Sequence, residues 1–231
     1  MLSNNEVGTI EPIKELAGIA HKHDALFHTD AVQSVGHIPI DVQELGVDML
    51  SASAHKFNGP KGVGFLYIRK GSFVQPYEDG GAQESGMRAG TENVAAIVGM
   101  AVALKANVEQ MAVYTEKMLS LETRLSQKLT EAGLDYKRNG AELHVPGNMS
   151  LSFKNVDGEM LLHRLDLMGI CVSTGSACDS KNTQVSHVLQ AMNIHDEYAR
   201  GTIRISLGKN NTVEDVDSII KALTKILKPN Y

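Results

Sequence analysis

The chain has 231 residues, and at ~150 residues per domain this length predicts one large domain or a domain and a half. Its residues are 42% hydrophobic and 21% charged, a globular composition that excludes disordered and collagen-like classes. The formal net charge of −5 disfavours a partner held by general positive charge, so we expect no binding to nucleic acid.

Cysteine content and the amino terminus indicate the compartment. Cys171 and Cys178 are too few for a disulfide framework and are not spaced as zinc ligands. The first residues have neither the basic nor the apolar region of a signal peptide, and the longest apolar stretch, residues 94–104, is too short to span a bilayer. We therefore expect a cytoplasmic protein with no membrane association and no metal site.

The first part of the chain alternates helices and strands at short spacing. In chain order, the pattern predicts a helix over 12–23 with Pro12 in its first position, a strand over 25–30, a helical turn over 31–35, a short helix over 42–45, and strands over 47–53 and 62–69. Such alternation predicts a mostly parallel sheet covered by helices. The last strand should be antiparallel, because its connection is too short for a helical crossover.

A glycine-rich loop over 78–90 separates this part from a helical stretch over 91–130, which predicts two helices or one bent helix. The domain boundary should lie inside this stretch, near 107–112. The remainder predicts a small α+β domain, with strands near 136 and over 148–153, 170–173 and 202–207, and helices over 157–168 and 213–227. Ser186 is expected to cap a further helix, and Cys171 to be a small buried residue at a strand end.

Two strand ends carry chemistry. Asp30 ends one predicted strand and Lys56 follows another, and in open α/β sheets ligands bind at the carboxyl ends of strands. A lysine there can be desolvated and become available for Schiff-base chemistry. A carboxylate facing a pyridine nitrogen keeps it protonated, as pyridoxal phosphate (PLP) chemistry requires. By itself, Asp30 is more often a helix cap, and a lysine is more often a surface residue.

These residues lie in motifs that resemble the NifS-like cysteine desulfurases of the class V aminotransferase superfamily. The motifs follow one another in the family's order, and they are residues 4–10, 28–33, 53–62, 87–93, 173–178, 186–189 and 203–208. The resemblance implies an aspartate aminotransferase-like, fold type I PLP-dependent transferase: an incomplete large domain with a mostly parallel sheet over 1–108 and a small α+β domain over 109–231. It also implies that the chain is similar to the C-terminal part of such an enzyme.

The resemblance further implies the site residues. Lys56 would bind PLP covalently, Asp30 would pair with the pyridine nitrogen, and Gln33 and Asn5 would contact the phenolic oxygen side. Ser53 and His55 would hold the phosphate, and Thr91 would reach the phosphate of the other subunit in a homodimer. Arg204 would bind the carboxylate of L-cysteine, and Asn5 would be a second substrate-binding residue.

The implied nucleophile is Cys178, in a small, polar run of residues. It would take the sulfur as a persulfide, with release of L-alanine, for an iron–sulfur scaffold or another sulfur acceptor. Two alternatives stay open: another class V enzyme such as a selenocysteine lyase or aminotransferase, or an inactive or split fragment that needs a separate N-terminal part.

Overall fold

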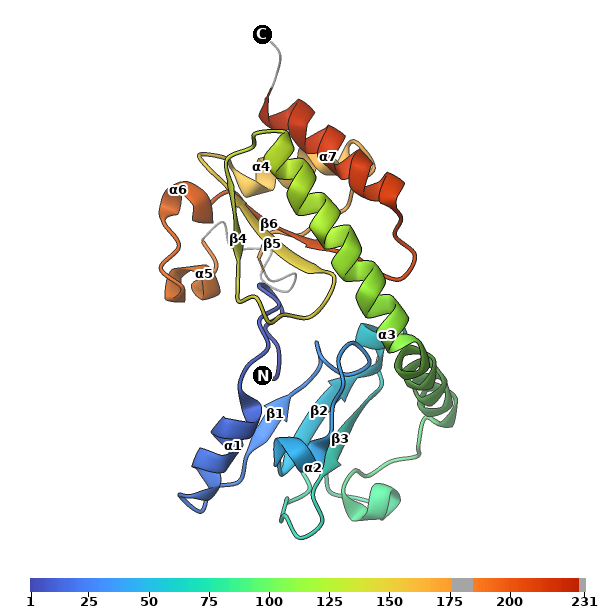
Figure 1. The fold of residues 1–231 in the computed structure, drawn as a ribbon. Helices are drawn as coiled ribbons and strands as arrows, with labels where there is room; N and C mark the ends of the chain where they lie inside the picture. Colours follow the sequence, from blue (N-terminus) through green and yellow to red (C-terminus); the bar gives the residue numbers. More distant parts are fainter. Residues whose placement is uncertain (176–184, 229–231) are drawn as a thin grey trace. The chain divides into compact units, whose positions relative to one another are not determined.

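A computed structural model describes residues 1–175 and 185–228, which form two compact units (Figure 1). Unit 1 comprises residues 1–2 and 11–111. Unit 2 comprises Ser3–Ile10 and the chain from Ala112 onward. A short amino-terminal segment therefore belongs to the second unit rather than to the first.

Unit 1 contains a three-stranded sheet in the order β1 (His28–Asp30), β2 (Met49–Ser53) and β3 (Gly64–Ile68). β1 pairs with β2 in parallel and β2 with β3 antiparallel. The antiparallel β3 is confirmed. With one pair of each kind the sheet of unit 1 is mixed rather than mostly parallel, and all three strands are shorter than predicted.

The unit 1 helices begin and end at local signals. α1 (Ile13–His21) starts one residue later than predicted, because Pro12 is its N-cap. α2 (Val42–Leu45) has the predicted bounds, since the Asp41 carboxylate accepts from two backbone N–H groups and Gly46 ends the helix at φ +71°. The 3-10 helices η1 (Ala54–Phe57) and η2 (Gln83–Gly86) lie in connections. The core of this unit comprises Leu2, Ile13, Ala31, Val35, Val47, Leu50, Ala52, Ala54 and Phe57.

The helical stretch is one continuous helix, α3 (Val94–Glu131), of 38 residues. Its first half packs Met100 and Leu104 against the core of unit 1, and its second half buries Leu125 and Leu129 in the core of unit 2. By length and composition α3 could cross a membrane, with a mean hydropathy of 1.3 over its most apolar window. The expectation from residues 94–104 alone underestimated its apolar length.

Unit 2 contains an antiparallel sheet in the order β4 (Tyr136–Asn139), β5 (Asn148–Phe153) and β6 (Thr202–Ser206). The amphipathic α7 (Val213–Leu227) follows a capping box formed by Thr212 and Asp215. α4 (Gly158–Asp166), α5 (His187–Ala191) and α6 (Asp196–Ala199) complete the described helices. Met149, Leu151, Ile203, Leu161 and Leu223 lie at the centre of this unit's core.

Three expectations for unit 2 have clear outcomes. Ser186 caps α5, as predicted, by accepting from the backbone N–H of Val188. The strand predicted over 170–173 is wrong, because only Ser173 pairs, as an isolated antiparallel bridge to Arg204. Cys171 is exposed rather than buried, since it lies in this unpaired segment instead of a covered strand.

Candidate functional site

The parallel pairing of β1 with β2 brings Asp30 and the residues that lead to Lys56 to one edge of the unit 1 sheet. Asp30 is in register with Ser51, and Lys56 follows β2 within η1. The backbone continues this pairing beyond β1, because Ala31 N–H donates to the Ser51 carbonyl over 2.9 Å. The predicted placement of both groups at the carboxyl ends of neighbouring strands is therefore present within unit 1.

Asp30 also stabilises the turn that follows it. Its Oδ1 accepts from the backbone N–H of Val32 over 2.8 Å, which is the capping role expected of an aspartate there. Residues 31–35 form a turn in which Val35 N–H donates to the Ala31 carbonyl. Gln33 lies in this turn and is half-buried, whereas Asp30 is exposed. The second carboxylate oxygen of Asp30 is available for another partner.

Lys56 is held in place through its backbone. Ala54 and Phe57 are fully buried and anchor η1, so His55 and Lys56 between them are exposed. The Lys56 carbonyl accepts from His37 Nε2 over 2.8 Å. The Lys56 amine is thus presented at the surface of unit 1, and the expectation that this amine is desolvated is not met within that unit.

Two further polar residues lie beside Lys56. Ser53 Oγ and His55 Nδ1 form a hydrogen bond of 2.8 Å with each other. Ser53, the residue before η1, is half-buried, and His55 is exposed. A hydroxyl and an imidazole held together in this way are suited to binding an anion, because whichever of the two donates to the other, the pair keeps one N–H or O–H donor for the anion.

Thr91 is exposed in the segment just before α3. The Arg88 guanidinium folds back on this segment, where its Nη1 donates to the carbonyls of Ala89, Gly90 and Thr91 over 3.1, 2.9 and 3.4 Å. Gly90 N–H in turn donates to Gln83 Oε1. These contacts explain why Thr91 lies ahead of the helix rather than inside it.

Arg204 and Asn5 come together in unit 2. Arg204 lies on β6 and donates from Nη1 to the Asn5 carbonyl over 2.7 Å. Its Nε is buried and has no hydrogen-bond partner among the described residues. Burial lowers the pKa of Arg204, and the nearby charge of Glu6 opposes that effect. A guanidinium with an unused buried donor is a fitting partner for a carboxylate.

Cys178 lies outside the described residues. The other cysteine, Cys171, is exposed, and its Sγ is 4.0 Å from Asp166 Oδ1. Within residues 1–175 and 185–228, no three histidine, cysteine or acidic side chains are grouped as a metal site would require.

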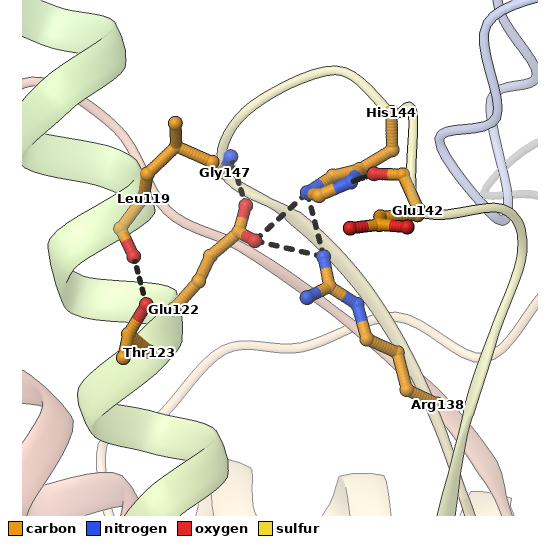
Figure 2. Close-up of polar contacts among 7 residues, drawn as sticks. All are labelled: Leu119, Glu122, Thr123, Arg138, Glu142, His144 and Gly147. Carbon is orange, nitrogen blue, oxygen red and sulfur yellow. Dashed lines mark hydrogen bonds and ion pairs between the residues drawn. The ribbon is translucent and has the colours of Figure 1, made fainter.

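Unit 2 contains a polar cluster, shown in Figure 2, that sequence reasoning did not predict. Glu122 of α3 is 2% exposed and accepts from Arg138 Nη2 over 2.7 Å and from Gly147 N–H, and its Oε2 is 2.8 Å from His144 Nε2. The cluster lines a pocket of about 680 Å³. Because Glu122, Arg138 and His144 are partners of one another, we interpret it as a structural link between α3 and the β4–β5 connection.

Comparison with known proteins identifies the family. The profile of the family described as Aminotransferase class-V matches residues 1–219. The chain belongs to this family. Class-V aminotransferases and their cysteine desulfurase relatives are PLP-dependent enzymes.

The relatives that the chain resembles are named cysteine desulfurases. It is 49% identical over 229 residues to the cysteine desulfurase IscS of Dictyoglomus turgidum, covering 99% of this chain and 58% of that protein. For the IscS of Methanosarcina thermophila the identity is 44%, covering 99% of this chain and 56% of that protein. The chain thus spans less than two thirds of the length of these relatives.

Solved structures show the same fold. A NifS-like protein matches with a TM-score of 0.89 at 43% identity, covering 98% of this chain and 60% of that one. A NifS-like protein from Rickettsia africae matches with a TM-score of 0.87 at 35% identity, covering 97% and 60%. The class-V chain therefore has part of the fold type I PLP-dependent transferase architecture.

The residues present in unit 1 fit the family's cofactor. Lys56 offers a primary amine, Asp30 a carboxylate with a free oxygen, and Ser53 with His55 a polar pair suited to phosphate. All four residues follow or end β1 and β2 at one sheet edge. This set of donors and acceptors has the chemistry that a pyridine ring with an aldehyde and a phosphate requires.

Proposed function

We propose that this chain carries the cofactor lysine, the substrate arginine and the nucleophilic cysteine of a PLP-dependent cysteine desulfurase. The observation that carries the proposal is the in-register parallel pairing of β1 with β2, which brings Asp30 and the Lys56 turn to one sheet edge. The names of the relatives with 44–49% identity support the choice of reaction.

In this proposal, four groups of residues bind and orient the cofactor. Lys56 supplies the amine that holds it, Asp30 holds the proton of the pyridine nitrogen, and Gln33 together with Asn5 contacts the phenolic oxygen side. Ser53 and His55 bind the phosphate. When bound, PLP supplies an electron sink for bond breaking at the substrate.

The unit 2 residues act on the substrate. Arg204 binds the carboxylate of L-cysteine with its guanidinium, whose Nε has no hydrogen-bond partner among the described residues. The Cys178 thiolate attacks the substrate sulfur, so the sulfur's bond to carbon breaks as a sulfur–sulfur bond forms. Cys178 is left as a persulfide, and the carbon skeleton takes up a proton and leaves as L-alanine. A sulfur acceptor, such as an iron–sulfur scaffold protein, then receives the persulfide sulfur.

The proposal extends to organisation and setting. Residues 1–108 form part of the cofactor domain and residues 109–231 the small domain. A homodimer in the cytoplasm, with Thr91 reaching the phosphate of the other subunit, completes the site.

A second candidate is that the chain acts only together with the remainder of the family's fold. Two observations favour it: the chain covers 58% of its first relative, and Lys56 is exposed in unit 1. An unburied amine is not protected from water, which competes for the same chemistry.

One experiment tests both candidates. The chain is mixed with PLP and L-cysteine, with and without the segment of a relative that it does not match, while absorbance, alanine and sulfide are measured. A cofactor band that Lys56→Ala removes, together with alanine formation, supports the proposal. Alanine formed only with the added segment supports the second candidate, and no alanine in either mixture refutes the desulfurase.

A further inference from the structure

Glu6 is a buried carboxylate that the proposed reaction does not use. It is 4% exposed and lies on the Ser3–Ile10 turn of unit 2. Asn4 Oδ1 holds this turn by accepting from the backbone N–H groups of Glu6 and Val7 over 2.8 and 3.1 Å. A buried charge is costly unless it is paired and hydrogen-bonded, so its partners indicate its role.

The turn itself is fixed to the body of unit 2. Ile10 N–H donates to the Leu143 carbonyl over 3.1 Å, and Val145 N–H donates to the Gly8 carbonyl over 2.9 Å. Leu143 and Val145 belong to the connection between β4 and β5. The turn that carries Glu6 is therefore fixed by hydrogen bonds to the connection between β4 and β5.

One oxygen of Glu6 accepts a hydrogen bond at the carboxyl end of the segment that carries Cys178, and the amino end of that segment lies beside the same oxygen. On the carboxyl side, Ser186 Oγ donates to Glu6 Oε2 over 2.5 Å while accepting from Val188 N–H over 3.1 Å. On the amino side, a methyl group placed on Gly175 would lie 3.8 Å from the same Oε2 and 3.9 Å from Ser186 Cβ. Gly175 and Ser186 therefore lie side by side at this carboxylate.

The same cluster includes Arg204. Its backbone pairs with Ser173, two residues before Gly175, through hydrogen bonds of 3.1 and 2.6 Å. Glu6 is also near enough to Arg204 for their charges to interact. The carboxyl end of the Cys178 segment is thus bonded to Glu6 through Ser186, and the amino end is paired through Ser173 with Arg204, whose charge interacts with Glu6.

We propose that Glu6 is a positioning residue for sulfur transfer, which fixes the carboxyl end of the Cys178 segment through Ser186 and balances the charge of Arg204, whose backbone pairs with Ser173 at the amino end. The inference rests on the proposed function. Joining the ends of a segment removes much of the conformational freedom of the residues between them. Restricting the positions that a nucleophile can take raises the rate of the chemical step more than it raises substrate affinity.

The rate of tryptic cleavage at Lys181 tests the role of the Ser186–Glu6 hydrogen bond without requiring any catalysis. Lys181 is the only lysine or arginine between Arg164 and Arg200. Ser186→Ala removes the donor to Glu6, and we expect cleavage at Lys181 to rise about tenfold, because proteases act on locally opened chain. Ser186→Thr keeps the hydroxyl and should restore the wild-type rate. Glu6→Gln keeps an acceptor oxygen without the charge and should give an intermediate rate.

Thr212→Ala is the matched control. It also removes a hydroxyl that caps a helix of unit 2, at α7, so it reproduces the loss of a cap without touching Glu6. We expect it to change cleavage at Lys181 by less than about twofold. Equal cleavage in Ser186→Ala and Thr212→Ala would overturn the proposal.

A kinetic measurement on the PLP-loaded enzyme separates positioning from binding. Ser186→Ala should lower kcat for alanine formation about tenfold with little change in KM for L-cysteine, and Ser186→Thr should recover it. A raised KM with unchanged kcat would overturn the positioning role. Absence of alanine in the wild type would refute the proposed function alone, because the cleavage comparison requires no turnover.

Discussion

Asp30 of β1 and Ser51 of β2 are partners in a parallel pair, and the backbone N–H after Asp30 donates to the Ser51 carbonyl. This relationship carries the proposed cofactor site. Parallel strands end on the same side of a sheet, so a carboxylate that ends β1 and a lysine that follows β2 share one edge.

Asp30→Asn should lower the rate of alanine formation by about a hundredfold or more, because a neutral amide no longer keeps the pyridine nitrogen protonated. The fold should be retained, because an asparagine oxygen can still accept from Val32 N–H. Alanine formation is the readout, and an unchanged circular dichroism spectrum is the control. A rate close to that of the wild type would show that Asp30 only caps the turn.

The two cysteines should differ in function. Cys178→Ala should abolish persulfide and sulfide formation from L-cysteine, because no thiolate remains to take the sulfur. Cys171→Ala should leave both unchanged, because Cys171 is exposed beside Asp166 and is not among the proposed site residues. Mass spectrometry of the protein after a single turnover locates the added sulfur. Sulfur found on Cys171 would reverse the assignment.

Asp48→Asn should destabilise unit 1 by about 1–3 kcal/mol, because buried Asp48 accepts from His21 Nε2 over 2.7 Å and from Phe27 N–H over 2.8 Å. Asp41→Asn is the control, because Asp41 is exposed and asparagine is an equally good cap. Urea denaturation at neutral pH measures the free energy of unfolding of the wild type and of both variants.

The effect of Asp48 should depend on pH. Although burial raises the pKa of Asp48, its hydrogen bonds to His21 and Phe27 and the charges of His21 and Arg69 outweigh burial and leave that pKa below its usual value. A lowered folded-state pKa contributes stability above the unfolded value of about 3.9, and this contribution is lost as pH falls through the folded value. The difference between wild type and Asp48→Asn should therefore shrink in acid. A difference that grows in acid would contradict this sign.

Glu122→Ala should destabilise unit 2 by about 3–5 kcal/mol, because it leaves Arg138 and His144 without their shared buried acceptor (Figure 2). Glu131→Gln on the same helix is the control. Glu131 pairs with Lys128 at the surface, and such pairs contribute little. Urea denaturation followed by circular dichroism gives the unfolding midpoints of Glu122→Ala and Glu131→Gln. Similar midpoints for both variants would show that the Glu122 cluster does not hold α3.

Gly64→Ala should disrupt the start of β3, because the added methyl carbon would lie within 2.3 Å of the Ala52 carbonyl oxygen. Gly18→Ala in α1 meets no atom within 4 Å and should stabilise the helix by up to about 1 kcal/mol. Thermal unfolding midpoints of both variants, compared with that of the wild type, measure these two changes in stability. A stable Gly64→Ala protein would show that β2 and β3 can separate at this point without cost.

The sequence determined the local elements of this protein and the residues that carry its proposed chemistry. The local residue pattern predicts α2 and α7 at their observed bounds, and the structure adds the caps that fix these bounds, Asp41 with Gly46 for α2 and Thr212 with Asp215 for α7. Asp30 and Lys56 could be assigned to one sheet edge because the alternation of helices and strands predicts parallel strands, whose carboxyl ends lie on the same side.

Tertiary structure decided what depends on residues far apart in the chain. Glu6 meets Ser186 across 180 positions, and no local period or cap signals such a pair. Cys171 reads as a buried strand residue, yet β6 pairs only with Ser173 there, so the thiol stays exposed. Burial and hydrogen bonding between distant segments depend on which surfaces pack together, and the order of residues within one segment does not contain that information.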